Sequence, residues 1–300
     1  MNRILITGGT GLIGKHLTTL LLAKGYTVYH LSRSAGSHAR VNTFVWDVEK
    51  GEIDERCIEG VDTIIHLAGA GIADKRWTDK RKKLIIESRT QSIRLLYSLL
   101  KRKPHTVKSV ISASGIGYYS DRADELMFED SAPNNDFLAV SCIKWENAVD
   151  EGAELGLRVV KFRTGVVLDT GGGALPKLAL PVKFGVGAAL GSGRQWLSWI
   201  HWHDAVAMYI FAIEHNIAGV YNMVAPNPVT NNQLIKEIAK TLKRPLWLPN
   251  VPAFALKAAL GELATAVLGS TKVSSQKIEK AGFKFEFIDV SAALKDIHGK

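Results

Sequence analysis

The sequence predicts an α/β protein with a doubly wound parallel sheet and a smaller lobe attached to it. Short apolar runs alternate with amphipathic helical segments through the first half of the chain, and the first apolar run ends in a glycine-rich turn. This alternation is typical of a parallel sheet that helices cover on both faces. We expect strands at 4–7, 27–31, 43–46, 61–67, 107–112 and 158–163, and helices at 12–24, 79–102 and 137–155.

Local patterns justify these elements in chain order. Leu17 and Leu21 lie on one face of the first helical segment, and Gly25 supplies its stop. The segment 27–31 is rich in β-branched and aromatic residues, which is typical of a strand. The segment 79–102 repeats apolar residues at helical spacing, so we expect a long helix there.

The segment 171–195 differs from the rest, with seven glycines, two prolines and little periodicity. A long loop in a compact domain is usually a lid over a functional site or a crossover into a second lobe. We therefore expect a sheet domain at residues 1–170 and a smaller C-terminal lobe at 171–300, interleaved with it. Beyond the loop we expect strands at 197–200 and 220–223, helices from about 203 and 231, and a helical tail.

Composition and charge limit the classes of protein that fit this chain. Its 46% apolar and 22% charged residues are close to globular averages, which excludes disorder and a coiled coil. Two cysteines, Cys57 and Cys142, cannot build a disulfide scaffold, and the apolar stretch 254–268 is too short to span a bilayer. We expect a cytoplasmic protein without membrane contact. The net charge of +9 leaves a phosphate-bearing ligand or nucleic acid open as partners.

The strongest motif joins the first strand to the first helix, where Thr7 to Gly14 reads TGGTGLIG. Gly8 permits a tight turn, Gly11 lets a pyrophosphate approach the backbone, and Gly14 lets the helix pack closely on the strand. The helix then offers free N–H groups and a partial positive charge to phosphates. This context predicts a Rossmann-type dinucleotide-binding turn; the alternative is an ordinary tight turn between strand and helix.

The glycine spacing resembles that of the short-chain dehydrogenase/reductase superfamily in its extended, epimerase-like form. Three other segments are similar to superfamily motifs, namely His66–Gly69, Ser112–Ser114 and Phe162–Leu168. The resemblance implies that the first lies under the cofactor, the second carries a catalytic Ser, and the third approaches the nicotinamide. Segments from Asp136 to Glu146, Ser198 to Asp204 and Leu248 to Phe283 are similar to one atypical branch, the epimerase family described as NAD-dependent nucleotide-sugar epimerases with a small C-terminal domain of unknown function.

The residues after the second strand predict which nicotinamide cofactor is bound. An Asp or Glu there would bind the ribose hydroxyls of NAD, whereas an Arg favours the 2′-phosphate of NADP. Ser32 and Arg33 stand there without a carboxylate, so we predict NADP(H) over NAD(H), a solvated Arg33 being the alternative. The resemblance adds Asp47 beside the adenine ring. The predicted cofactor-binding residues are Gly8, Thr10, Gly11, Leu12, Ile13, Gly14, Ser32, Arg33, Asp47, Ala68 and Gly69.

The usual catalytic pair of the superfamily, a Tyr four residues before a Lys, is incomplete in this chain. The resemblance makes Lys144 the ligand of the nicotinamide ribose and Ser114 the group that polarises a substrate carbonyl or hydroxyl. Val140 stands four residues before Lys144 and cannot transfer a proton. Tyr118 is the predicted replacement acid, although aromatic residues in such a loop also pack or stack. The other candidate donors are Tyr119, Ser114 and Cys142.

Other polar residues bear on the substrate and on further ligands. Tyr119 and Arg194 are predicted to bind the substrate, Arg194 through an anionic group, although a solvated loop Arg is equally consistent with the sequence. The segment 201–204 offers two His and one Asp without a fourth ligand, so we predict no metal site. Nucleic-acid binding would call for several interleaved aromatic residues, and the basic segment 75–83 contains only Trp77, so we predict no nucleic-acid binding.

These observations lead to two hypotheses. The first is an NADP(H)-dependent oxidoreductase or epimerase that acts on a small polar substrate, with a nucleotide sugar among the candidates, as a monomer or homodimer. The second is a non-catalytic NADP(H)-binding or redox-sensing protein, which Val140 favours because the usual catalytic Tyr is missing.

Overall fold

The computed structural model of the chain describes residues 3–36 and 40–299. Within them, eight strands form one sheet in the order β12-β8-β6-β5-β1-β2-β3-β4, parallel except for the short edge strand β4. The chain winds from central β1 to one side through β2 and β3, and then to the other side through β5, β6 and β8. The strands are β1 (Arg3–Thr7), β2 (Thr27–Ser32), β3 (Asn42–Asp47), β4 (Glu52–Ile53), β5 (Thr63–His66), β6 (Ser109–Gly115), β8 (Arg158–Thr164) and β12 (Gly219–Met223).

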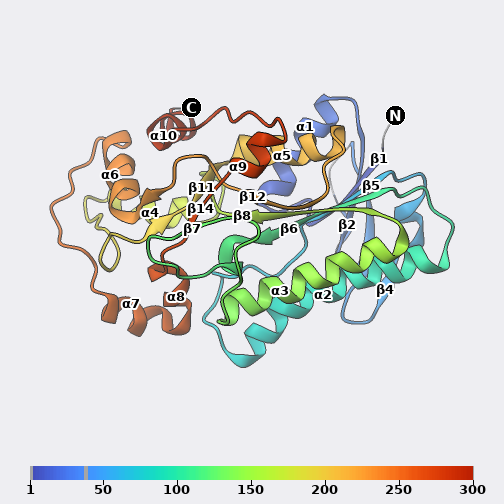
Figure 1. Ribbon diagram of the computed structural model, residues 1–300, viewed down its shortest axis with the longest axis horizontal. Helices are drawn as coiled ribbons and strands as arrows, with labels where there is room; N and C mark the ends of the chain where they lie inside the picture. The colour runs from blue at the N-terminus through green and yellow to red at the C-terminus, as the bar shows by residue number, and fades with distance from the viewer. Residues whose placement is uncertain (1–2, 37–39, 300) are drawn as a thin grey trace.

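Helices cover both faces of this sheet, as the alternation of apolar runs predicts (Figure 1). The helices α1 (Leu12–Ala23), α5 (Trp202–Glu214) and α9 (Gln276–Lys280) share one buried apolar cluster with the sheet. The long helix α2 (Asp79–Arg102) and α3 (Phe137–Asp150) share another cluster on the opposite face. The prediction of a doubly wound, Rossmann-type sheet is therefore confirmed.

The glycine-rich segment 171–195 is not a continuous loop, because it contains the helix α4 (Leu175–Lys183). Pro176 is tolerated in the first turn, where the backbone N–H has no helical partner, but Pro181 lies inside the helix. Burial of Leu175, Ala179 and Val182, at helical spacing, stabilises the segment against this interruption. The expectation of one long loop over 171–195 was wrong, because tertiary packing outweighs the local proline signal.

The C-terminal part of the chain is divided between the sheet and a separate group of helices. The strand β12 pairs with β8 at the edge of the main sheet, so the chain returns to the sheet well after residue 170. The helices α4, α6 (Asn231–Thr241) and α10 (Val290–His298) pack around their own apolar cluster. Smaller elements complete this part: β7 (Leu126–Met127), β9 (Val166–Leu168), β10 (Trp196–Leu197), β11 (Trp199–His201), β13 (Val229–Thr230), α7 (Ala253–Leu260), α8 (Ala264–Leu268) and β14 (Lys272–Val273).

The basic segment 75–83 connects α2 to the C-terminal helices. The Arg76 guanidinium donates to the carbonyl oxygens of Ala258 and Ala259 at the end of α7. Lys82 pairs with Glu262, which follows that helix. Part of the positive charge of the segment therefore fastens α7 to the sheet domain. No helix in the described part of the chain is both long and apolar enough to cross a membrane.

Candidate cofactor and active site

The glycine-rich turn between β1 and α1 has the geometry that its sequence predicts. Gly8 adopts a φ of +72°, and a Cβ there would lie 2.9 Å from the carbonyl carbon of Leu67. A Cβ at Gly14 would lie 2.7 Å from the Cα of Gly9, so only glycine lets α1 begin this close to the turn. No side chain caps the first turn of α1 at Gly11. Its amide groups are therefore left for an anionic ligand.

The loop after β5 is fastened beside this turn. The amides of Leu67 and Ala68 donate to the hydroxyl oxygen of Thr7 at 3.2 and 3.1 Å. This pairing brings the predicted cofactor residue Ala68 next to Gly8, at the point where the strand order changes direction, and Gly69 follows it.

The residues predicted to select the cofactor lie at the carboxyl ends of β2 and β3. Arg33 is exposed directly after β2, with the half-buried Ser32 beside it. The Asp47 carboxylate accepts the amides of Glu49 and Lys50, and the hydrogen bond from Lys50 contributes most to lowering its pKa. Arg33 is thus available to a phosphate, while the Asp47 carboxylate already binds its own turn.

A cavity of about 730 Å³ lies at the carboxyl ends of β6 and β8, bordered by residues 115–117 and 164–166. Helix α3 contributes Leu138 and Cys142 to its lining, four residues apart on one helical face. Val140 and Lys144 are not part of that lining, and Lys144 is exposed. The predicted contact of Lys144 with the cofactor ribose therefore has no support in the structure.

The face of α3 that looks into the cavity offers little proton-transfer chemistry. Leu138 cannot ionise, and burial raises the pKa of the Cys142 thiol to about 12. The Cys142 sulfur lies against the glycines of the loop after β6, where a Cβ at Gly115 would be 3.6 Å away. Cys142 is a neutral, packed thiol in this environment. The Tyr–Lys pair has no counterpart on this face.

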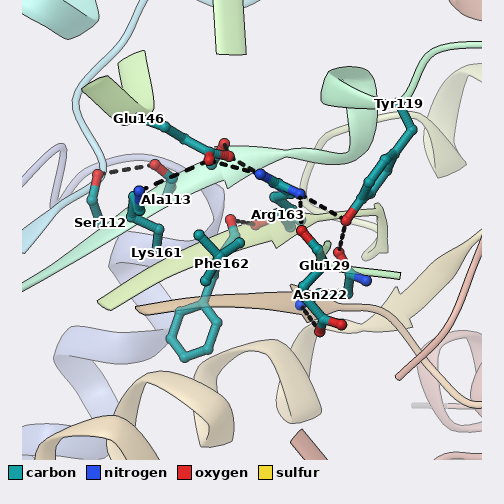
Figure 2. A network of polar contacts seen from close by, with 12 residues as sticks. Ser112, Ala113, Tyr119, Glu129, Glu146, Lys161, Phe162, Arg163 and Asn222 are labelled. Atoms are coloured by element: carbon teal, nitrogen blue, oxygen red, sulfur yellow. Dashed lines mark hydrogen bonds and ion pairs between the residues drawn. The ribbon is translucent and has the colours of Figure 1, made fainter. Parts of the chain in front are cut away.

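A buried ion pair joins α3 to β8, where Arg163 directly precedes Thr164 of the cavity border (Figure 2). The Arg163 guanidinium donates from Nε and Nη2 to the two carboxylate oxygens of Glu146, at 2.8 and 2.9 Å. Both side chains are almost fully buried, with 3% and 5% of their residues' surface exposed. Lys161 lies 4.0 Å from the same carboxylate and pairs with Asp150. Two strand cations thus surround one helix carboxylate.

Ser114 belongs to this network rather than to the open cavity. Its hydroxyl donates to Glu146 Oε1 at 2.7 Å, and the residue is buried. A hydroxyl has one proton, so in this arrangement Ser114 presents only lone pairs to any other partner. It can accept a hydrogen bond from a hydroxyl but cannot donate one to a carbonyl oxygen unless the contact with Glu146 breaks.

The two tyrosines of the loop after β6 also pack on Arg163. The Tyr119 hydroxyl accepts from Arg163 Nη1 at 2.9 Å and donates to Asn222 Oδ1 at 2.8 Å (Figure 2). Burial raises the pKa of Tyr119 to about 12. The Tyr118 ring lies 3.4 Å from the guanidinium carbon of Arg163. Neither tyrosine lines the cavity, so the predicted roles of Tyr118 as acid and Tyr119 as substrate ligand stay predictions.

The remaining predicted residues lie outside the cavity lining. Arg194 is exposed, and its neighbours Ser192 and Gln195 line the cavity instead. Asp204 accepts the amides of Glu286 and Phe287 and so holds the C-terminal segment against α5. Among residues 3–36 and 40–299, no group of three His, Cys, Asp or Glu side chains could hold a metal ion.

Sequence reasoning assigned no role to Glu146 or Arg163. Both stand next to buried aromatic residues, Glu146 beside Trp145 in α3 and Arg163 beside Phe162 in β8. Opposite charges in two buried elements are a signal for an ion pair, because an unpaired buried charge is costly. That signal was present in the sequence.

Comparisons with known proteins agree with this geometry. Residues 4–223 match the NAD-dependent epimerase/dehydratase family, and residues 251–297 match a domain of unknown function, DUF1731. The chain is 39% identical over 297 residues to the epimerase family protein YfhF of Bacillus subtilis, covering 98% of this chain and 97% of that protein. It superposes on the human epimerase family protein SDR39U1, solved with NADPH, with a TM-score of 0.89 at 32% identity, over 99% of both chains.

A further solved structure is similar over part of its length. The nucleoside-diphosphate sugar epimerase of Corynebacterium glutamicum superposes with a TM-score of 0.79 at 32% identity, over 98% of this chain and 57% of that one. The chain therefore belongs to the NAD-dependent epimerase/dehydratase family and ends in the DUF1731 domain, as its resemblance to the atypical extended branch implied.

We expect Glu146→Gln to lower the free energy of unfolding by about 3–5 kcal/mol, because Arg163 would keep a buried charge without its counter-charge. Urea denaturation of the variant beside the wild type measures this difference. Glu154→Gln is the matched control, since Glu154 is exposed, and its effect should stay within about 0.5 kcal/mol. Equal unfolding free energies for the two variants would show that the ion pair does not stabilise the fold.

Substitutions in the glycine turn should separate folding from ligand binding. Gly14→Ala should cost about 3 kcal/mol of stability, because its Cβ meets backbone atoms that cannot move aside. Gly11→Ala should cost less than about 1 kcal/mol, since its Cβ would be 3.2 Å from a single atom, the Gly8 carbonyl oxygen. The Gly11 variant should nevertheless lose NADPH affinity in a fluorescence titration; wild-type affinity would contradict close phosphate approach at this position.

Proposed function

We propose that the chain is an NADP(H)-dependent oxidoreductase or epimerase whose active site is the cavity at the ends of β6 and β8. The observation that carries the proposal is the glycine turn after β1, in which Gly8 and Gly14 leave room that a Cβ would fill, at the same carboxyl edge of the sheet at which the cavity lies beyond β6 and β8. The uncapped start of α1 would bind the diphosphate, and Arg33 the 2′-phosphate. When bound, the nicotinamide donates or accepts a hydride.

The cavity lining bears on the class of substrate. Its charged side chains are Asp121, Asp136 and Lys257, and most other lining residues are small or apolar. Asp136 caps α3 by accepting the amide of Ala139. A nucleotide sugar carries a negatively charged diphosphate, for which this lining supplies Lys257 alone among the described residues. We therefore place a small, uncharged polar carbonyl or hydroxyl compound ahead of a nucleotide sugar.

A second candidate function is a non-catalytic NADP(H)-binding or redox-sensing role. The observation that favours it is the pair Leu138 and Cys142 on the cavity face of α3, because neither side chain exchanges a proton near neutral pH. Ser114 and Tyr119 do not fill the gap in this arrangement, since their protons are donated to Glu146 and Asn222.

The cofactor assignment is tested by Arg33→Ala. We expect its affinity for NADPH to fall by about tenfold to a hundredfold, because a charge-assisted contact with the 2′-phosphate is lost, while its affinity for NADH stays unchanged. Titration of both reduced cofactors by fluorescence measures the two affinities. Arg194→Ala, which removes another exposed arginine, is the control and should bind NADPH like the wild type. Equal wild-type affinities for NADH and NADPH would contradict the role of Arg33.

Turnover separates the two candidate functions. The protein is incubated with NADPH and a panel of uncharged aldehydes and ketones, with UDP-glucose as a separate arm, and cofactor absorbance is followed. We expect oxidation of NADPH by members of the uncharged panel. Tight NADPH binding without turnover across the panel and the UDP-glucose arm would overturn the enzymatic proposal and favour the sensor.

A further inference from the structure

Arg89 is a buried cation that the functions above do not use. It lies in the middle of α2, between α3 and the loop after β5, and only 7% of its surface is exposed. Its Nη1 donates to the carbonyl oxygen of Ile85 in the same helix at 2.8 Å. Its guanidinium carbon lies 4.9 Å from the centre of the Trp145 ring. These contacts hold the side chain in place, but neither brings a negative charge to it.

The positive charge of Arg89 has no counter-charge in the described part of the chain. No carboxylate in that part of the chain forms an ion pair with Arg89. The nearby Arg81 is also a cation, and, beyond the effect of burial, its charge lowers the pKa of Arg89 further. Burial lowers the pKa of Arg89 to about 10, as expected for a desolvated cation without a carboxylate. Arg163 shows the contrast, since it is buried to a similar degree but paired with Glu146. A buried, unpaired charge destabilises a fold unless a ligand compensates it.

The guanidinium lies where a ligand in the cofactor cleft would pass. A Cβ at Gly69 would lie 3.0 Å from the guanidinium carbon of Arg89. The exposed Gly69, which has no side chain, therefore separates Arg89 from the cleft only by its backbone. On the other side Arg89 acts electrostatically on Cys142, which lines the cavity. Within the described residues, the Nε and Nη2 atoms of Arg89 make no hydrogen bond. Neither atom belongs to the set of polar atoms that are fully buried and lack a partner, so both are partly exposed. These two groups therefore keep access to solvent and to a ligand.

The strand order indicates which part of the cofactor would lie there. The diphosphate site is the start of α1, and Arg33 follows β2 on one side of β1. An extended dinucleotide with its 2′-phosphate half at β2 must continue to the other side, over the ends of β5 and β6. Gly69 follows β5 and Cys142 packs on the end of β6, so the nicotinamide half would cross both.

We propose that Arg89 binds phosphate and ribose oxygens of the nicotinamide half of NADP(H), as a ligand supplied from α2 rather than from α3. This inference rests on the proposed function and names a residue that the cofactor motifs did not include. It also explains why glycine stands at position 69, because any larger side chain would push the guanidinium away from the cleft.

The test compares Arg89→Met, a neutral side chain of similar length, with the wild type. Affinity for NADPH should fall by about tenfold to a hundredfold, as for the loss of a charged hydrogen bond. Affinity for adenosine 2′,5′-bisphosphate, which lacks the nicotinamide half, should change less than about twofold. The melting temperature of the ligand-free variant should rise, because an uncompensated buried charge is removed. A purely structural arginine would give the opposite shift and no difference between the two ligands.

Two controls keep the test specific. Arg94→Met alters an exposed arginine of the same helix that pairs with Glu151, and it should leave both affinities unchanged. Gly69→Ala should weaken NADPH binding in the wild type more than in the Arg89→Met background, because the added methyl group acts by displacing the guanidinium.

Each adverse outcome has a distinct meaning. Wild-type NADPH affinity in Arg89→Met would overturn the role of Arg89 and leave the proposed function intact. An equal loss for NADPH and for the bisphosphate would also overturn it, since the contact would then not belong to the nicotinamide half. Failure of the wild-type protein to bind NADPH at all would overturn the proposed function, and this role with it.

Discussion

The ion pair between Arg163 and Glu146 holds together the edge of the sheet on which the candidate active site depends. It joins β8 to α3 (Figure 2), and Glu146 extends it to Ser114 on β6. Through the Tyr119 hydroxyl, Arg163 also reaches Asn222 on β12. Desolvation of such a pair is offset only when its remaining hydrogen-bonding groups are satisfied, and here each nitrogen of the guanidinium has an acceptor. The four elements β6, β8, β12 and α3 are thereby fixed relative to one another, and all but β12 contribute residues to the cavity lining.

This network has a chemical consequence, because it uses polar groups that could otherwise serve catalysis. The proton of Ser114 is committed to Glu146, and the proton of Tyr119 to Asn222. The groups of α3 that reach the cavity are a leucine and a neutral thiol. The chain thus combines a well-formed dinucleotide turn with a cavity to which α3 presents no acid or base group. Apart from Asp121, Asp136 and Lys257 in the cavity lining, the proton for any hydride transfer here must come from the substrate, from water, or from a side chain freed by ligand binding.

The sequence was sufficient to predict those features whose physical cause lies in neighbouring residues of the chain. The parallel sheet, its main helices and the glycine turn follow from periodicity and from the steric need at Gly8 and Gly14, which neighbouring residues determine. On α3, Leu138 and Cys142 line the cavity, whereas the predicted ribose ligand Lys144 does not, because the rotation of a helix about its axis depends on packing that the sequence does not state. The helix α4 was not predicted because it also depends on tertiary packing, since burial of three apolar side chains outweighs the effect of Pro181.

The structure shows different roles for individual basic residues, which the net charge of the sequence does not distinguish. Arg76 and Lys82 fasten α7 and the segment after it, and Arg163 is neutralised inside the sheet domain. Arg89 differs from Arg163, because it is also buried but has no carboxylate paired with it in the described part of the chain. A buried cation with a counter-charge can stabilise the folded chain by itself, whereas one without a counter-charge is retained at the expense of stability. Residues kept at such a cost cluster where ligands bind, so the missing counter-charge, more than the net charge, points to the cofactor cleft.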